Sequence, residues 1–98
     1  MKIQEILDEL SSFAPKMIEG NEKNEVFRLA EDYNSDYDED ALFVGDETTS
    51  YLPAFKSSGT LVITQEAYFQ APPYALNIII VEIADIEEIK IRLRALLD

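Results

Sequence analysis

Two short apolar stretches decide the fold of this chain: Thr60-Leu61-Val62-Ile63-Thr64 and Ala75-Leu76-Asn77-Ile78-Ile79-Ile80-Val81. Both are rich in β-branched residues and both are too short to be buried helices, so each predicts a strand. A third stretch, Ala41-Leu42-Phe43-Val44-Gly45, predicts another buried strand. Because the apolar residues are nearly continuous, we expect these strands to be covered on both faces of the sheet.

Both ends of the chain predict amphipathic helices. Near the N-terminus, the apolar side chains fall within an arc of ~120° on a helical wheel; they are Ile3, Ile6, Leu7, Leu10 and Phe13, and Pro15 closes this helix. Near the C-terminus, Asp85 is expected to cap a helix, with Glu88 and Arg92 as an i,i+4 ion pair. The buried face of that helix is expected to carry Ile86, Ile89, Leu93, Leu96 and Leu97.

The segments between these elements are shorter and more polar. Pro53 belongs in a first helical turn, so residues 50–57 predict a short helix that joins strands 41–45 and 60–64 in a parallel βαβ unit. Residues 65–74 predict a loop or one helical turn, and residues 19–24 a polar loop. Residues 26–29 are compatible with a short strand.

A length of 98 residues fits one domain, which we place at residues 1–98. Together, the elements predict an α/β domain with a small, mostly parallel sheet of three to four short strands covered by three helices.

The charge of the chain excludes several kinds of partner. It has 20 acidic and 8 basic residues and no His, so its net charge is −12. Such a chain repels phosphate backbones and anionic lipid headgroups, so we expect no nucleic acid and no membrane contact. Early acidic residues such as Glu5 and Asp8 argue against a signal sequence, and the longest apolar run, 78–81, is too short to span a bilayer. We therefore expect a cytoplasmic location.

The residue types present also limit catalysis and metal binding. With no Cys and no His, thiolate nucleophiles, Cys-type zinc sites and the usual general base are missing, so we expect no enzymatic activity and no cofactor. Asp36, Asp38, Asp40 and Glu47 match positions 1, 3, 5 and 12 of an EF-hand loop, but position 6 is Ala41 where the turn needs Gly. We therefore expect a solvated acidic loop and no metal site.

Two groups of apolar residues are candidate contact surfaces. Tyr68, Phe69 and Tyr74 lie around Pro72-Pro73, and they either line a groove for a ligand or partner or plug one end of the core. Ile91 and Ala95 lie opposite the main stripe of the last helix. They are either isolated surface residues or the centre of a homodimer interface. The sequence leaves these alternatives open.

Residues 36–97 contain a pattern that resembles a known family. Its parts are an apolar strand ending in Val44-Gly45, the stretch Ser50-Tyr51-Leu52-Pro53, the two apolar strands that follow Gly59, and the final helix. The pattern resembles the N-terminal region of some PucR/CdaR-type bacterial transcriptional regulators.

In those regulators the module precedes a helix-turn-helix and is thought to sense a metabolite or to hold the regulatory arrangement. The resemblance implies a non-enzymatic regulatory domain that responds to a small-molecule effector or a protein contact, with DNA binding outside this chain. The alternative is a stand-alone acidic domain for protein–protein interaction, which would use its acidic face against a basic partner.

Overall fold

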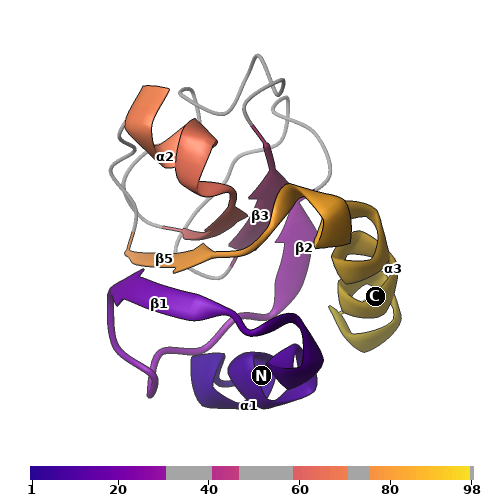
Figure 1. The fold of residues 1–98 in the computed structure, drawn as a ribbon. Helices are drawn as coiled ribbons and strands as arrows, with labels where there is room; N and C mark the ends of the chain where they lie inside the picture. Colours follow the sequence, from indigo (N-terminus) through magenta and orange to yellow (C-terminus); the bar gives the residue numbers. More distant parts are fainter. Residues whose placement is uncertain (31–40, 47–58, 71–75, 98) are drawn as a thin grey trace.

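The described part of the chain builds a sheet of five strands with helices on both faces (Figure 1). The computed structural model describes residues 1–30, 41–46, 59–70 and 76–97. Three parallel strands lie at the centre, where the apolar stretches predict them: β3 (Ala41–Gly45), β4 (Thr60–Ile63) and β5 (Asn77–Ile80). The parallel pairing of β3 with β4, expected of a βαβ unit, is confirmed. The helix predicted at residues 50–57 lies outside the described residues.

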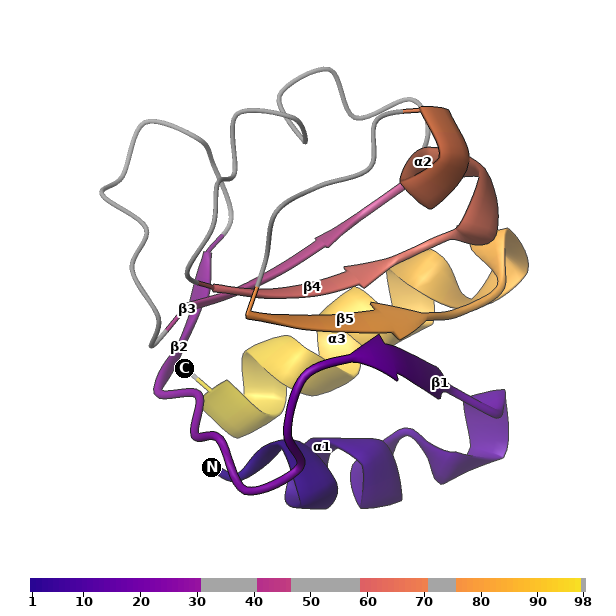
Figure 2. The same ribbon diagram turned by 90° about the vertical axis from the view of Figure 1, so that its left-hand side faces the viewer.

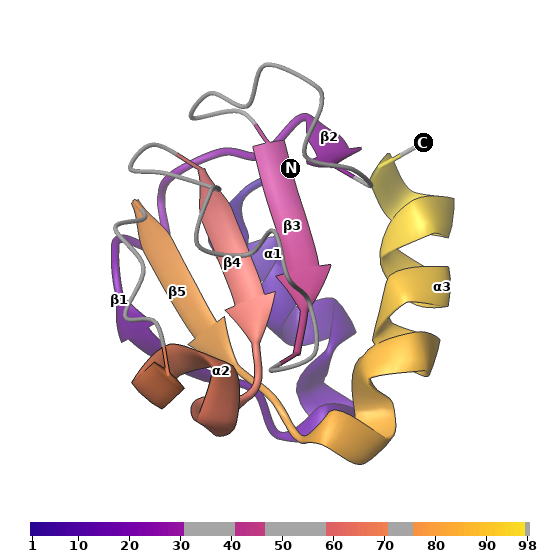
Figure 3. The same ribbon diagram turned by 90° about the horizontal axis from the view of Figure 1, so that it is seen from above.

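The described sheet has five strands, so the prediction of three to four was too low. The strand order is β1-β5-β4-β3-β2, with β2 (Arg28–Ala30) parallel to β3 and β1 (Lys16–Glu19) antiparallel to β5 (Figure 3). β1 escaped the prediction because no side chain in it is fully buried, and its last residue, Glu19, was assigned to a loop. It exists because β5, about sixty residues later in the chain, supplies its hydrogen-bonding partner.

Apolar side chains alternate between two cores, one on each face of the sheet. Leu42, Val44, Val62 and Ile79 face the helices α1 (Ile3–Glu9) and α3 (Ile86–Leu97), while Phe43, Leu61, Ile63 and Ile78 face α2 (Gln65–Gln70). Figure 2 shows the sheet between these helices. The expectation of cover on both faces is confirmed, and it explains why β3 and β4 are buried along their whole length.

The helices differ from prediction mainly at their ends. α1 stops at Glu9, and a 3-10 turn, η1 (Ser11–Phe13), completes the predicted segment. A second 3-10 turn, η3 (Ile83–Asp85), precedes α3. α2 has six residues where a loop or single turn was predicted; the Thr64 hydroxyl oxygen accepts the Ala67 N–H at 3.2 Å, and Ala67 is buried against the sheet.

The prediction for α3 is right in its centre and wrong at one position. Ile86, Ile89 and Leu93 are buried, but Leu96 is 39% exposed, because it lies at the margin of the buried stripe. The predicted pair of Arg92 and Glu88 is present at 3.8 Å. The Arg92 guanidinium also lies 5.0 Å from the centre of the Phe13 ring, which connects α3 to η1.

A buried amide ties the N-terminal segment to the amino ends of β4 and β5. Asn77 is 1% exposed, and its Oδ1 accepts the Asn21 N–H and an Asn24 Nδ2–H, both at 3.0 Å. Its Nδ2 donates to the Thr60 hydroxyl at 3.0 Å. Gly20 has a φ of +114°, and a Cβ there would collide with the Asn77 amide, so the close approach requires glycine.

Candidate functional site

A shallow groove of about 220 Å³ lies between α2 and the edge strand β1. The side chains that line it are Lys16, Ile18, Gln65, Tyr68, Phe69 and Ile80. β1 contributes Lys16 and Ile18 because residues two apart in a strand share one face of the sheet. α2 contributes the two aromatic residues, which are neighbours in its last turn.

The walls of this groove are mainly apolar and partly exposed. The Phe69 side chain is 63% exposed and Ile18 is 37% exposed, whereas Tyr68 is half-buried and packs against the core under α2. The Tyr68 and Phe69 rings lie 5.9 Å apart at an angle of 58°. Such rings give large contact areas at a low cost in side-chain entropy, so the groove is suited to hold an apolar side chain of a partner.

Tyr68 and Phe69 lie together at this hollow, and a ligand or partner contact there stays a prediction. The third predicted aromatic residue, Tyr74, lies outside the described residues. Lys16 and Ile18 were missed by sequence reasoning. The four residues between Pro15 and Gly20, Lys-Met-Ile-Glu, show no alternation of polar and apolar side chains, so only their pairing with β5 reveals the edge strand.

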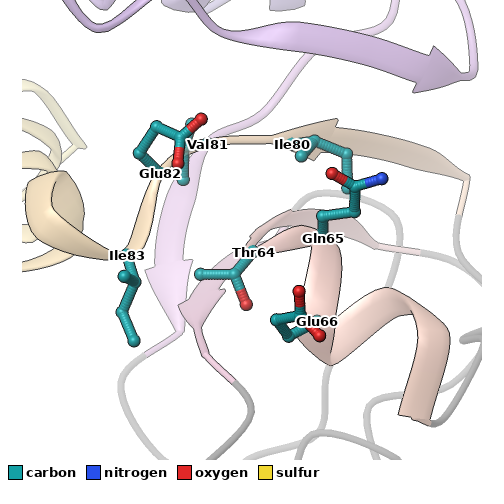
Figure 4. Close-up of a pocket in the computed structure, with 7 residues that line it drawn as sticks. All are labelled: Thr64, Gln65, Glu66, Ile80, Val81, Glu82 and Ile83. Carbon is teal, nitrogen blue, oxygen red and sulfur yellow. The ribbon is translucent and has the colours of Figure 1, made fainter.

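A second hollow, of about 190 Å³, lies at the carboxyl ends of β4 and β5 (Figure 4). Its polar lining includes Thr64, Glu66 and Glu82, and the Thr64 hydroxyl already caps α2. Parallel sheets usually bind ligands at this end, at a point where the strand order reverses. The described parallel strands follow the order β5-β4-β3-β2 without a reversal, so the crevice typical of such sites is not formed among them.

The predicted acidic loop, with Asp36, Asp38, Asp40 and Glu47, lies outside the described residues. Within residues 1–30, 41–46, 59–70 and 76–97, no group of three or more His, Cys, Asp or Glu side chains is placed to hold a metal ion. In the same part of the chain, no helix has both the length and the apolar character needed to cross a membrane.

Comparison with known proteins adds no relative. No family model, no curated protein and no solved structure matches this chain. The resemblance to PucR/CdaR-type regulators therefore stays a hypothesis, and the function must be argued from the surfaces of the molecule.

The other predicted contact residues lie on the outer surface of α3. Ile91 is 61% exposed and Ala95 is exposed as well, on the side of the helix away from the buried Ile89 and Leu93. Their exposure agrees with their position in the sequence, opposite the main apolar stripe of the helix. Whether a second subunit covers them is untested.

Proposed function

We propose that this chain is a non-enzymatic regulatory module of a bacterial transcriptional regulator, and that it acts by binding a protein partner at the groove between α2 and β1. The observation that carries the proposal is the exposure of Phe69 beside Ile18 and Tyr68 in a preformed apolar hollow. The absence of Cys and His from the sequence supports binding over catalysis.

The size of the groove favours a protein partner over a small-molecule effector. Pockets for drug-sized ligands usually enclose about 300–1,000 Å³ and bury most of the ligand. This groove has about 220 Å³ and a Phe69 side chain that is more than half exposed. Such a surface suits one apolar anchor side chain on a larger partner.

The charge of the chain supports a partner with basic residues around that anchor. Glu19 follows Ile18 in β1 and Glu66 follows Gln65 in α2, and both carboxylates are exposed. Lys16 is the charged residue that lines the groove itself. With a net charge of −12, the chain attracts cationic partners over long distances and repels acidic ones. A stand-alone acidic interaction domain, the alternative function, would use the same groove.

The first prediction tests the groove with a matched pair of variants. Random 12-residue peptides displayed on phage and selected on the wild-type chain are expected to carry an apolar anchor flanked by Lys or Arg. Phe69→Asp should weaken their binding at least tenfold, because the substitution places a carboxylate where the anchor packs. Phe27→Asp is the control, since Phe27 is 62% exposed and does not line the groove. Isothermal titration of synthetic peptides gives the affinities.

Two results would contradict the proposal. One is a set of peptides that bind Phe69→Asp as tightly as the wild type. The other is a set whose binding is lost in Phe27→Asp and kept in Phe69→Asp. Circular dichroism of each variant checks that the fold is unchanged.

The second prediction is that DNA contact lies outside this chain. A 30-base-pair random duplex at about 20 mM salt should show no gel shift with this chain, although low salt most favours phosphate binding through counterion release. The charge of −12 is the reason. A clear shift under these conditions would refute the assignment of DNA binding to another part of the regulator.

A further inference from the structure

The helix α3 carries a charge unlike that of the rest of the chain. It holds three of the eight cations, Lys90, Arg92 and Arg94, and only two carboxylates, Glu87 and Glu88. Among the described helices it alone is net positive, because α1 carries three carboxylates and no cation and α2 carries Glu66. On a chain of charge −12, α3 is thus the helix that a second copy can approach with the least repulsion.

The charges on α3 are also ordered along its axis. Glu87 and Glu88 lie in the first turn, and Arg94 lies in the last turn. On the outer face, the exposed Ile91 lies between them, and the exposed Ala95 follows Arg94. A second α3 that runs in the opposite direction would therefore place basic residues beside acidic ones and apolar residues beside apolar ones.

We propose that the outer face of α3 binds the α3 of a second copy, antiparallel and about a two-fold axis that passes at Ile91. In this register Ile91 packs against its own counterpart, Glu87 of each copy faces Arg94 of the other, and Ala95 lies opposite Glu88. The two helix dipoles also oppose each other favourably in this arrangement. The contact is isologous, so it closes at a dimer.

This dimer leaves the groove at α2 and β1 accessible. α3 packs on one face of the sheet and α2 on the other, as Figures 2 and 3 show. The dimer and the partner site are therefore separate surfaces. The proposal for α3 does not rest on the proposed function.

The test uses single cysteines, because the natural chain has none. Two packed helices with axes 8–10 Å apart would bring the two Cα atoms at position 91 within about 5 Å, which suits a disulfide. At position 95 the same register separates the two Cα atoms by about 12 Å. Under mild oxidation, Ile91→Cys is expected to form a disulfide-linked dimer at least tenfold faster than Ala95→Cys. An equal mixture of Glu88→Cys and Ala95→Cys should form the mixed dimer.

Ile83→Cys is the control for random collision, since Ile83 is 53% exposed and lies outside α3. Equal rates at positions 83 and 91 would overturn the proposal. Rapid linkage at both 91 and 95 would overturn the antiparallel arrangement, because it is the pattern of parallel helices.

Sedimentation equilibrium at physiological ionic strength provides an independent readout without cysteines. The wild type is expected to dimerise, and Ile91→Lys should weaken the dimer at least tenfold. Arg94→Glu should weaken it several-fold, and combining it with Glu87→Arg should restore most of the loss, because the charges of the pair are then exchanged. A wild type that stays monomeric up to about 1 mM, the affinity of the weakest specific contacts, would overturn the proposal.

Discussion

Replacing Asn77 with alanine is expected to lower the free energy of unfolding by about 3 kcal/mol, because three hydrogen bonds are lost at a buried site. The Asn77 amide contacts Thr60, 17 residues before it, and also Asn21 and Asn24, which lie 56 and 53 residues before it. Alanine leaves the Asn21 N–H without its acceptor and the Thr60 hydroxyl without its donor. Thr60 is fully buried, so water cannot replace that donor without opening the structure.

The effect extends beyond these contacts because the segment held by Asn77 also supports α1. The Ile3 N–H donates to the Asn24 carbonyl oxygen at 2.9 Å, and the Gln4 N–H donates to that of Glu22 at 3.1 Å. These N–H groups belong to the first turn of the helix, where they have no acceptor within it. Loss of the amide therefore weakens both the 20–24 segment and the amino end of α1.

Urea denaturation followed by circular dichroism measures this loss as a lower transition midpoint with an unchanged slope. Asn24→Ala is the control, because it removes one of the three hydrogen bonds at a partly exposed side chain and should cost about 1 kcal/mol. An Asn77→Ala variant no less stable than Asn24→Ala would show that the amide does not hold the segment.

The central sheet was predictable from sequence because its signals are local. β3, β4 and β5 are nearly continuous runs of β-branched and apolar residues, and burial on both faces requires such runs. The edge strand β1 has no such requirement, since its pairing with β5 holds it through backbone hydrogen bonds that any sequence can form. Strand number was therefore underestimated at the edges of the sheet, where side-chain patterning is weakest.

The candidate site likewise combines residues that the local sequence pattern identifies with residues that only tertiary pairing brings in. Tyr68 and Phe69 attract attention in the sequence because large aromatic residues stand between predicted elements. Lys16 and Ile18 complete the groove only because β1 lies beside β5 and α2 follows β4, which is a consequence of tertiary pairing. A contact between residues fifty positions apart leaves no mark on the local pattern of a single sequence.

The last prediction compares two isoleucines on one helix. Ile89→Ala is expected to lower the free energy of unfolding by about 2–5 kcal/mol, whereas Ile91→Ala should change it by less than about 0.5 kcal/mol. Ile89 is fully buried with Val44, Val62 and Ile79 of the sheet, so truncation removes apolar contacts and leaves a cavity. Ile91 is 61% exposed, and the better helix propensity of alanine offsets the little burial it loses.

The measurement must separate folding from association, because a dimer adds stability that depends on concentration. Thermal and urea unfolding at low micromolar protein should show the large difference between Ile89→Ala and Ile91→Ala. At the higher concentrations where the wild type dimerises, Ile91→Ala should become less stable than the wild type, because it removes the contact at the two-fold axis. If Ile91→Ala is destabilised equally at both concentrations, Ile91 serves the fold of the single chain. If it is not destabilised at either, the outer face of α3 makes no contact with a second copy.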